Sequence, residues 1–550
     1  MPLPSAANAT PSMAQWFDLK HQEPDALLFF RMGDFYELFF GDAQAAAMAL
    51  DIALTARGNH NGEPIPMCGV PVAAAPAYLS RLIRRGFRVA VAEQTQSPQK
   101  GQKGPLPRAI VRVVTPGTLT EDELLEAGRA NLLLAIARSG NRRSGMIGAA
   151  WIDISTGAFE TTSVPEAALP ELMARLDAAE VLSDPELIPA DHASRLAPVA
   201  VPPTIDSART LIARAYGVAQ LDALGDFPDE QAIACAMALN YVQRSQAGAL
   251  PRLSRPIPQG VSGVLGIDPA TRASLDILRT RDGETKYSLF GVVSRTATAA
   301  GSRLLSQWLS SPLTNAQQIT DRQNAWLWLQ SVPGLVGSLG DILKRTPDPA
   351  RALGRLSAGR GQPRDLAAIR DTLIAADDLT GLLQPVCDEQ TPTLIRTLTA
   401  GLYGRADTLL DRLKAAVAED LPARIEDGGF IAAGFNEELD RYRTLRDESR
   451  RIVAALQGRL SEEYGIGNLK IRHHAQLGYV IEVPSTAGAK LKDRPELSFR
   501  QGTASLARFS TEELAALDRA ILEAADKASA LERRLFSSSA SASPGRSARR

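Results

Sequence analysis

The stretch "FFRMGDFYELFFGDA", residues 29–43, places six aromatic residues around a Gly-Asp pair and a single glutamate. It predicts extended structure whose aromatic side chains pack in a core, with a turn at Met32-Gly33-Asp34. Phe35 and Glu37 are two residues apart, so they share one face of an extended segment. The turn directs Phe35 outward. The core is expected to take Phe29, Phe30, Leu38, Phe39 and Tyr36, and a core position is less expected for Phe35 and Glu37.

An exposed phenylalanine beside a carboxylate suits a task on DNA. Apolar side chains inserted between base steps unstack and kink the duplex, and a carboxylate can accept a hydrogen bond from a base edge. A glutamate close to phosphates also costs energy, which discourages stable insertion into intact duplex. The alternative is that the whole aromatic cluster is core. Acid–base catalysis by Asp34 and Glu37 is disfavoured, because no His, Cys or Lys clusters with them in the sequence.

The bulk composition is that of a globular protein. A chain of 550 residues is long enough for about three to four domains. The net charge of −1 does not exclude nucleic acid, because charge can segregate by region. The three cysteines, Cys68, Cys235 and Cys387, form no CxxC pair, which indicates neither a zinc site nor a disulfide framework. With no signal pattern and no run of about 18 apolar residues, we expect a soluble, intracellular protein.

Charge separates the regions that follow the opening stretch. Residues 145–164 predict a β-hairpin through Ser-Thr-Gly, within a segment that alternates helix and strand. Residues 117–250 hold 9 basic and 18 acidic residues, a net charge of −9. Phosphates repel such a segment, so it is not expected to contact DNA. After a Pro-rich linker at 250–260, residues 267–430 predict mostly helix.

The C-terminal third predicts two long helices that flank a small β insertion. The first spans about 436–464 and the second about 511–536, with a capping box formed by Ser510 and Glu513. Between them, residues 468–485 alternate as strands. Residues 441–510 hold 13 basic and 7 acidic residues, a net charge of +6. The second helix carries a heptad seam at Leu514, Leu517, Ile521, Ala524, Ala528, Leu531 and Leu535.

Several catalytic signatures are missing from the sequence. It contains no Gly-Lys dipeptide, hence no P-loop, and neither HExxH nor GxSxG. The adjacent His473 and His474 would point to opposite faces of a strand, which favours residues near phosphate over a metal pair. A nuclease would need a carboxylate cluster, and Asp153 has no evident partner at a readable spacing. No metal or cofactor site is therefore expected.

The sequence resembles the MutS family of DNA mismatch repair proteins over roughly residues 12–536. The resemblance begins with "FFRMGDFYELF", similar to the family's Phe-x-Glu mismatch-reading segment. It continues, in the family's order, with "PIPMCGVP" (64–71), "YLSRLIRRGFRVAVAEQ" (78–94), "VRVVTPGT" (111–118), "WIDISTG" (151–157), "RLLSQWLSSPL" (303–313), "GRGQPRDL" (359–366), "IEDGGFIAAGFNEELD" (425–440) and "LGYVIEVP" (477–484).

The resemblance implies a multidomain α+β and α/β fold. Its parts are a mixed α/β mismatch-binding domain (12–118), a ribonuclease-H-like connector (125–250), an all-α core with lever helices (265–440 and 510–536) and a small β clamp (441–509). Residues 537–550 are expected to be a disordered tail.

The resemblance also assigns functional residues. Phe35 is the wedge that stacks on a mispaired base, and Glu37 is its hydrogen-bonding partner. Lys470, Arg472 and Arg500 would grip the DNA backbone, although solvated surface charge is the alternative for each. The expected partners are mismatched or looped double-stranded DNA and, through the connector, MutL-like repair proteins. The resemblance also implies a cytoplasmic, nucleoid-associated bacterial protein.

The family continues into a P-loop ATPase domain that binds ATP and Mg²⁺ and makes most of the dimer contact. We therefore expect this chain to be truncated, by a shortened or frame-shifted gene or a split coding region. It should not hydrolyse ATP alone, and its dimerisation is in doubt. The main alternative function is a regulatory remnant that binds repair partners without gripping DNA.

Overall fold

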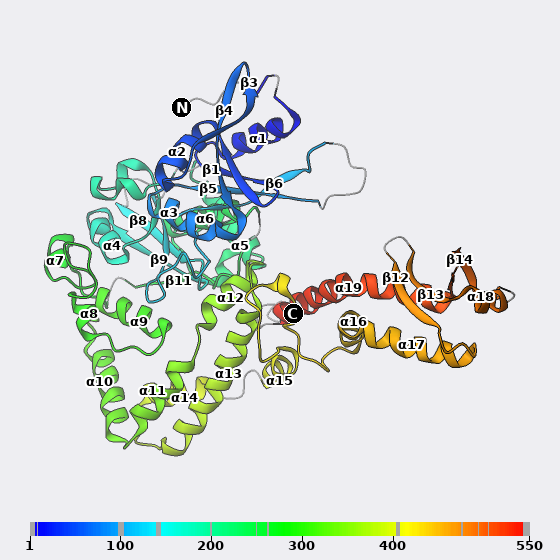
Figure 1. The fold of residues 1–550 in the computed structure, drawn as a ribbon. Coiled ribbons are helices and arrows are strands. Elements are labelled where there is room, and N and C mark those ends of the chain that lie inside the picture. Colours follow the sequence, from blue (N-terminus) through cyan, green and yellow to red (C-terminus); the bar gives the residue numbers. More distant parts are fainter. Residues whose placement is uncertain are drawn as a thin grey trace. The chain divides into compact units, whose positions relative to one another are not determined.

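The computed structural model describes residues 6–7, 9–96, 104–138, 145–197, 201–248, 250–260, 263–402, 407–474, 477–492, 494–503 and 505–542 (Figure 1). These residues form two compact units. The first holds residues up to 361 together with 368–402, and the second holds 362–367 and 407–542. No helix in the described part of the chain is long and apolar enough to cross a membrane.

The first unit begins with a mixed six-stranded sheet in the order β3-β4-β2-β1-β5-β6. Only β1 and β5 pair in parallel, and the other neighbours are antiparallel. The elements are α1 (Pro11–Gln22), β1 (Leu27–Met32), β2 (Phe35–Phe39), α2 (Phe40–Leu50), β3 (Thr55–His60), β4 (Glu63–Pro71), α3 (Ala75–Arg84), β5 (Val89–Gln94) and β6 (Arg108–Val114).

Both faces of this sheet are covered, because successive side chains of a strand point to opposite sides. On one face Phe30 and Phe39 pack with Trp16 and Phe17 of α1. On the other, Phe29, Tyr36 and Leu38 pack with α2 and α3. The predicted core residues Phe29, Phe30, Tyr36, Leu38 and Phe39 are all buried, which confirms that part of the prediction.

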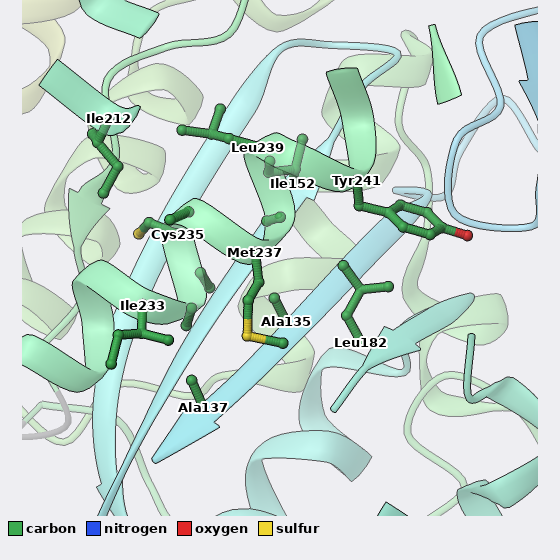
Figure 2. Close-up of a cluster of buried hydrophobic side chains, with 14 of the residues drawn as sticks. Ala135, Ala137, Ile152, Leu182, Ile212, Ile233, Cys235, Met237, Leu239 and Tyr241 are labelled. Atoms are coloured by element: carbon green, nitrogen blue, oxygen red, sulfur yellow. The ribbon is translucent and has the colours of Figure 1, made fainter. Parts of the chain in front are cut away.

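A second sheet has the order β10-β7-β8-β9-β11. The predicted hairpin of residues 145–164 is present as antiparallel β8 and β9. Helix α6 covers one face, and Figure 2 shows Ile233 and Met237 of this helix in one apolar cluster with Ala135 of β7. The elements are β7 (Leu132–Arg138), β8 (Met146–Asp153), β9 (Ala158–Pro165), α4 (Leu169–Leu176), β10 (Glu180–Leu182), α5 (Ile205–Tyr216), α6 (Asp229–Ser245) and β11 (Ile257–Pro258).

A buried carboxylate ties the segment after β6 to this second sheet. Glu180 of β10 accepts hydrogen bonds from Thr115 Oγ1 and from the backbone N–H of Gly117 at 3.0 Å. Tyr241 of α6 donates its hydroxyl to the other oxygen at 2.6 Å. Burial raises the pKa of Glu180, while these three donors act in the opposite direction. Three donors on one carboxyl group hold the Thr-Pro-Gly-Thr turn in place.

The rest of the first unit is helical, as predicted. Five of its helices begin after a residue whose side chain accepts a backbone N–H, namely Asp268, Ser288, Thr298, Asn315 and Asp348. The helices are α7 (Pro269–Ser274), α8 (Leu289–Val293), α9 (Ala299–Ser310), α10 (Ala316–Ser331), α11 (Leu335–Arg345), α12 (Pro349–Ser357), α14 (Thr393–Leu402) and α13 (Pro363–Leu383), whose first five residues belong to the second unit.

Helix α12 is fixed to the rest of the unit by two buried arginines. Arg351 donates to the carbonyl oxygens of Glu126 and Arg129 at 3.0 and 2.8 Å, and Arg355 pairs with Asp122. Gly354 allows this approach, since a Cβ there would lie 2.2 Å from the carbonyl oxygen of Ser155. Charge-assisted hydrogen bonds thus replace apolar packing where the helix meets the segment 122–129.

The second unit is built on helices and a four-stranded antiparallel sheet, β12-β13-β15-β14, which lies at one end of α17 and α19 (Figure 1). The predicted heptad seam of α19 is confirmed: Leu514, Ala524, Ala528 and Leu531 are buried, and the other three positions are half-buried. The elements are α15 (Asp407–Ala416), α16 (Glu437–Asp447), α17 (Ser449–Glu463), β12 (Lys470–His474), β13 (Gly478–Pro484), α18 (Ser485–Leu491), β14 (Ser498–Gly502), β15 (Leu506–Ser510) and α19 (Glu512–Ala542).

Two predictions for the helices of this unit are corrected. The helix predicted over 436–464 is two helices, interrupted at Glu448 between Asp447 and Ser449, residue types of modest helix propensity. The predicted capping box at Ser510 is wrong, because Ser510 ends β15 and the cap is Thr511. Thr511 Oγ1 accepts the N–H of Leu514 at 3.0 Å.

The predicted disordered tail over 537–550 is also wrong at its beginning. Helix α19 continues through Ala542. The hydroxyls of Ser537 and Ser538 donate to the carbonyl oxygens of Arg533 and Leu535, at 3.0 and 2.8 Å, so these serines bond within the helix. Residues 543–550 lie outside the described part of the chain.

The α12 junction makes a stability prediction. Arg351→Lys should lower the free energy of unfolding by about 1–3 kcal/mol, because a lysine ammonium cannot reproduce the guanidinium geometry at two carbonyl groups. The measurement is the urea midpoint of the full chain. Arg451→Lys is the matched control, since its side chain is 83% exposed. Equal midpoints for the two variants would contradict the assigned role of Arg351.

Candidate nucleic-acid interface

The β1–β2 hairpin sets the position of Phe35. The two strands are joined by Gly33 and Asp34, and Gly33 has φ +61°, a conformation that favours glycine. The predicted turn is therefore present. Phe35 is the first residue of β2 and is 46% exposed, whereas the next four residues of the strand are buried. The sequence prediction that the turn directs Phe35 outward is confirmed.

The exposed ring of Phe35 lies over the neighbouring strand β4. Phe35 pairs with Pro71, and its Cδ1 lies 3.6 Å from the position that a Cβ on Gly69 would occupy. Phe35, the candidate wedge, is thus held by a hydrogen-bonded sheet, and part of its ring is exposed to solvent. A rigid mounting reduces the entropy lost when such a side chain inserts into a partner.

Glu37 is not exposed beside Phe35, contrary to the expectation that both leave the core. It is 7% exposed and lies between Phe30 of β1 and Gly69 of β4 in the strand register. Its Oε1 pairs with Nη1 of Arg57 from β3. Its Oε2 is buried and has no hydrogen-bond partner within the described residues. Burial raises the pKa of Glu37, and the positive charges of Arg57 and Arg108 oppose that rise.

Two of the cations around this strand were missed by sequence reasoning. Arg57 lies 20 residues after Glu37, and nothing in the sequence pairs the two. Arg108 of β6 places its guanidinium carbon 4.6 Å from the ring centroid of Phe30 and donates through Nε to the carbonyl oxygen of Arg31 at 2.6 Å. A polar cluster also surrounds Tyr36, whose hydroxyl donates to Glu93.

An aromatic cluster supports the far end of β2. Trp16 and Phe17 of α1 contact Phe40 with ring centroids 5.1 and 5.5 Å apart, and His60 of β3 lies 5.4 Å from Phe17. Phe40 has φ +52°, an unusual conformation for a bulky residue. Packing of this ring compensates for its backbone strain, so the chain turns sharply from β2 into α2.

The predicted backbone-binding residues lie on the sheet of the second unit. Lys470 and Arg472 are exposed on β12, two residues apart and hence on one face. Arg500 is exposed on β14, at the register irregularity between Phe499 and Gln501. Lys470 and Arg500 form no ion pair with any described residue.

Part of this positive charge is neutralised by Glu482 of β13. Its carboxylate accepts from Arg508 at 2.8 Å and contacts His474 at 3.0 Å and Arg472 at 3.7 Å. Burial alone would raise the pKa of Glu482, but the bonds from Arg508 and His474 hold it below its ordinary value. His473 lies on the opposite face against Tyr479, as predicted for adjacent strand residues.

Asp153 has a structural role in its turn. Its Oδ1 accepts from the backbone and the hydroxyl of Ser155 at 3.0 and 2.6 Å, and its Oδ2 accepts the N–H of Asn131 at 3.3 Å. Within the residues that the structure describes, no group of three His, Cys, Asp or Glu side chains is placed to hold a metal ion. Cys68, Cys235 and Cys387 are all free thiols.

Comparison with known proteins gives one family along the chain. Family models for MutS domain I, domain II and domain III match residues 10–123, 131–254 and 270–539. Similar proteins are the DNA mismatch repair proteins MutS of Granulibacter bethesdensis, at 54% identity over 95% of this chain, and of Rhodopseudomonas palustris, at 45% over 97%. The chain spans 56% and 60% of their respective lengths.

The half-satisfied carboxylate of Glu37 makes a pH-dependent prediction. Burial raises the pKa of Glu37 in the folded protein, so at a pH just above its ordinary value the folded state binds more of this proton than the unfolded chain does. The free energy of unfolding therefore falls as the pH rises from the ordinary pKa of a glutamate to the raised pKa of Glu37. Glu37→Gln should stabilise the chain by about 1 kcal/mol at pH 8 and by less at pH 4.

The measurement is thermal unfolding of the wild type and the variant at both pH values. Glu93→Gln is the control for removing a nearby carboxylate that already has partners, because Glu93 accepts from Tyr36 and pairs with Arg31. A stabilisation by Glu37→Gln that is the same at pH 4 and pH 8 would contradict the argument.

Proposed function

The chain belongs to the MutS family of DNA mismatch repair proteins, and from this premise we propose that it binds duplex DNA at mispaired or looped positions. In this proposal Phe35 inserts as a wedge and Glu37 is the hydrogen-bonding partner of the displaced base. The observation that carries the proposal is the exposure of Phe35 at the head of a strand whose other side chains are buried.

The energetics of stacking give the wedge its selectivity. Unstacking a base step costs a few kcal/mol in paired DNA, and less where the base pair is already disrupted. Insertion of a phenylalanine is therefore most favourable at a mispaired position, where unstacking the base step costs the least free energy. Specificity then comes from deformability rather than from the identity of a base pair.

Glu37 adds a hydrogen bond to the selection of mispaired positions by the Phe35 wedge. Its buried Oε2 lacks a donor within the described residues. In this proposal the insertion of Phe35 uncovers that oxygen, and the edge of the displaced base supplies an N–H. In intact duplex the bases stay stacked and paired, so only their groove-facing N–H groups are exposed. The carboxylate thus penalises contact with phosphates and favours contact with an opened base pair.

The basic sheet supplies affinity that does not depend on sequence. Lys470 and Arg500 are exposed and form no ion pair within the described residues, although Glu482 lies opposite Lys470 in the strand register, and Arg472 contacts Glu482. Cations of this kind release counterions when they contact phosphates. The acidic segment 117–250, with net charge −9, is assigned no DNA contact.

The test of the wedge is fluorescence anisotropy with a labelled duplex that carries one G·T mismatch, compared with the matched duplex. Phe35→Ala should reduce the preference for the mismatch by about 1–3 kcal/mol, the range found for one base stacked on an aromatic side chain. Affinity for the matched duplex should change little. Met48→Ala, which removes an 84% exposed side chain of the same sheet domain, is the control.

Other outcomes separate the rival functions. Equal binding of both duplexes by wild type and by Phe35→Ala would contradict the wedge role of Phe35. Absence of binding to either duplex would favour the alternative of an interaction module that engages repair proteins without gripping DNA.

The basic sheet makes its own prediction. Lys470→Gln and Arg500→Gln should each weaken binding to the mismatched and the matched duplex alike. Each should reduce the slope of log K against log salt by about 1, because one phosphate contact is lost. Lys344→Gln, whose side chain is 71% exposed, is the control. An unchanged salt slope would mean that the two residues are solvated surface charge.

Three expectations stay predictions. MutL-like proteins dock on the connector, this chain alone does not form the family's dimer readily, and it neither binds ATP and Mg²⁺ nor hydrolyses ATP. The proposed function is therefore one of binding, with no catalytic residue assigned.

A further inference from the structure

The two oxygens of Glu37 differ in a way that the proposed function leaves unexplained. Oε1 is held by the guanidinium of Arg57, whereas Oε2 is buried and has no hydrogen-bond donor within the described residues. Leaving a buried acceptor unpaired costs free energy, and such groups are rare in folded proteins. The carboxylate of Glu37 is therefore held through Oε1, while Oε2 keeps its capacity to accept a hydrogen bond.

Arg57 reaches Glu37 because of an irregularity in an edge strand. The pairing of β3 with β4 shifts register between Ala56 and Asn59, and Arg57 lies in that interval, before Gly58 at φ +71°. From there its side chain extends across β4 to β2. It remains 51% exposed, whereas the side chain of Glu37 is 9% exposed. The guanidinium group is thus exposed, whereas the carboxylate is almost completely covered.

Few other charges act on this carboxylate. The register neighbours of Glu37 are Phe30 on β1 and Gly69 on β4, which carry no charge. Arg108 of β6 contributes a favourable field, and Arg57 is the cation that forms the hydrogen bond. Both cations keep the pKa of Glu37 from rising as far as burial would take it.

We propose that Arg57 is a positioning residue for base reading: by holding Oε1 of Glu37 it orients Oε2 for the hydrogen bond offered by a displaced base. The inference rests on the proposed function and adds a residue to it. The ligand group is an N–H on the edge of a base that has left its pair. Arg57 acts through Glu37 and need not touch the base.

A direct phosphate contact is the competing role for an exposed arginine, and it predicts different behaviour. A phosphate contact strengthens binding to every duplex equally and does not depend on Glu37. A positioning residue changes the preference between duplexes, and only while Glu37 is present. A double-mutant cycle distinguishes the two.

The experiment measures the G·T-to-matched affinity ratio for the full chain. The variants are Arg57→Gln, Arg57→Lys, Glu37→Gln and the Glu37→Gln/Arg57→Gln double variant. Arg57→Gln should lower the ratio about tenfold, the effect of losing one charge-assisted hydrogen bond. Arg57→Lys should retain part of the ratio, and Arg57→Gln should have no effect in the Glu37→Gln background. Arg84→Gln controls for the loss of one exposed positive charge from the same domain.

The pH dependence of the ratio gives a second readout. Without Arg57 the buried carboxylate loses its main counter-charge, so the midpoint of the Glu37-dependent change should move to higher pH in Arg57→Gln. The residual field of Arg108 is common to wild type and variant. A role of Arg57 in strand stability alone would leave this midpoint in place.

Two results would overturn the inference. One is an unchanged ratio and pH midpoint in Arg57→Gln while the wild type prefers the mismatch. The other is an equal loss of affinity for both duplexes that persists in the Glu37→Gln background, which would make Arg57 a phosphate contact. If the wild type itself shows no preference, the proposed function fails and the role of Arg57 fails with it, a result that the wild-type ratio alone identifies.

Discussion

The pairing of β2 with β1 on one side and β4 on the other is the constraint on which the candidate site depends. Side chains alternate along a strand, so a slip of one residue would exchange the two faces of β2. The register set by the short turn at Gly33 puts Tyr36 and Leu38 into the core beneath α2 and α3. The same register puts Phe39 against α1 and leaves Phe35 at the open end.

Much of this strand could be predicted from the sequence, because the signals are local. Aromatic residues around a Gly-Asp turn define both the hairpin and the buried positions. The burial of Glu37 could not be predicted in this way, because its partner Arg57 arrives through an irregular edge strand. The junction of Arg351 with residues 126 and 129 lies beyond local reasoning for the same cause, since more than 200 residues separate the partners. The misplaced cap at Ser510 shows that a short pattern locates a helix start only to within a residue.

Two buried carboxylates of the first unit, Glu180 and Glu37, are hydrogen-bonded in different ways. Both oxygens of Glu180 accept hydrogen bonds, and these bonds hold the turn at residues 115–118 in place. Glu37 receives a donor on one oxygen only. Fully connected polar groups make a structure unique, whereas a half-connected one lowers stability. Local rules are broken in this way most often at sites that must bind something else.

The irregular pairing of β3 recurs in the sheet of the second unit. Arg57 lies in a register shift of β3, and Arg500 lies in a register shift of β14. Both strands are at the edge of their sheets, where unpaired backbone groups invite another strand to add. A bulge that carries a cation disrupts the flat template which such an addition requires. Arg57 and Arg500 therefore lie where an added strand would have to pair, and a cation in an irregular edge strand disfavours such an addition.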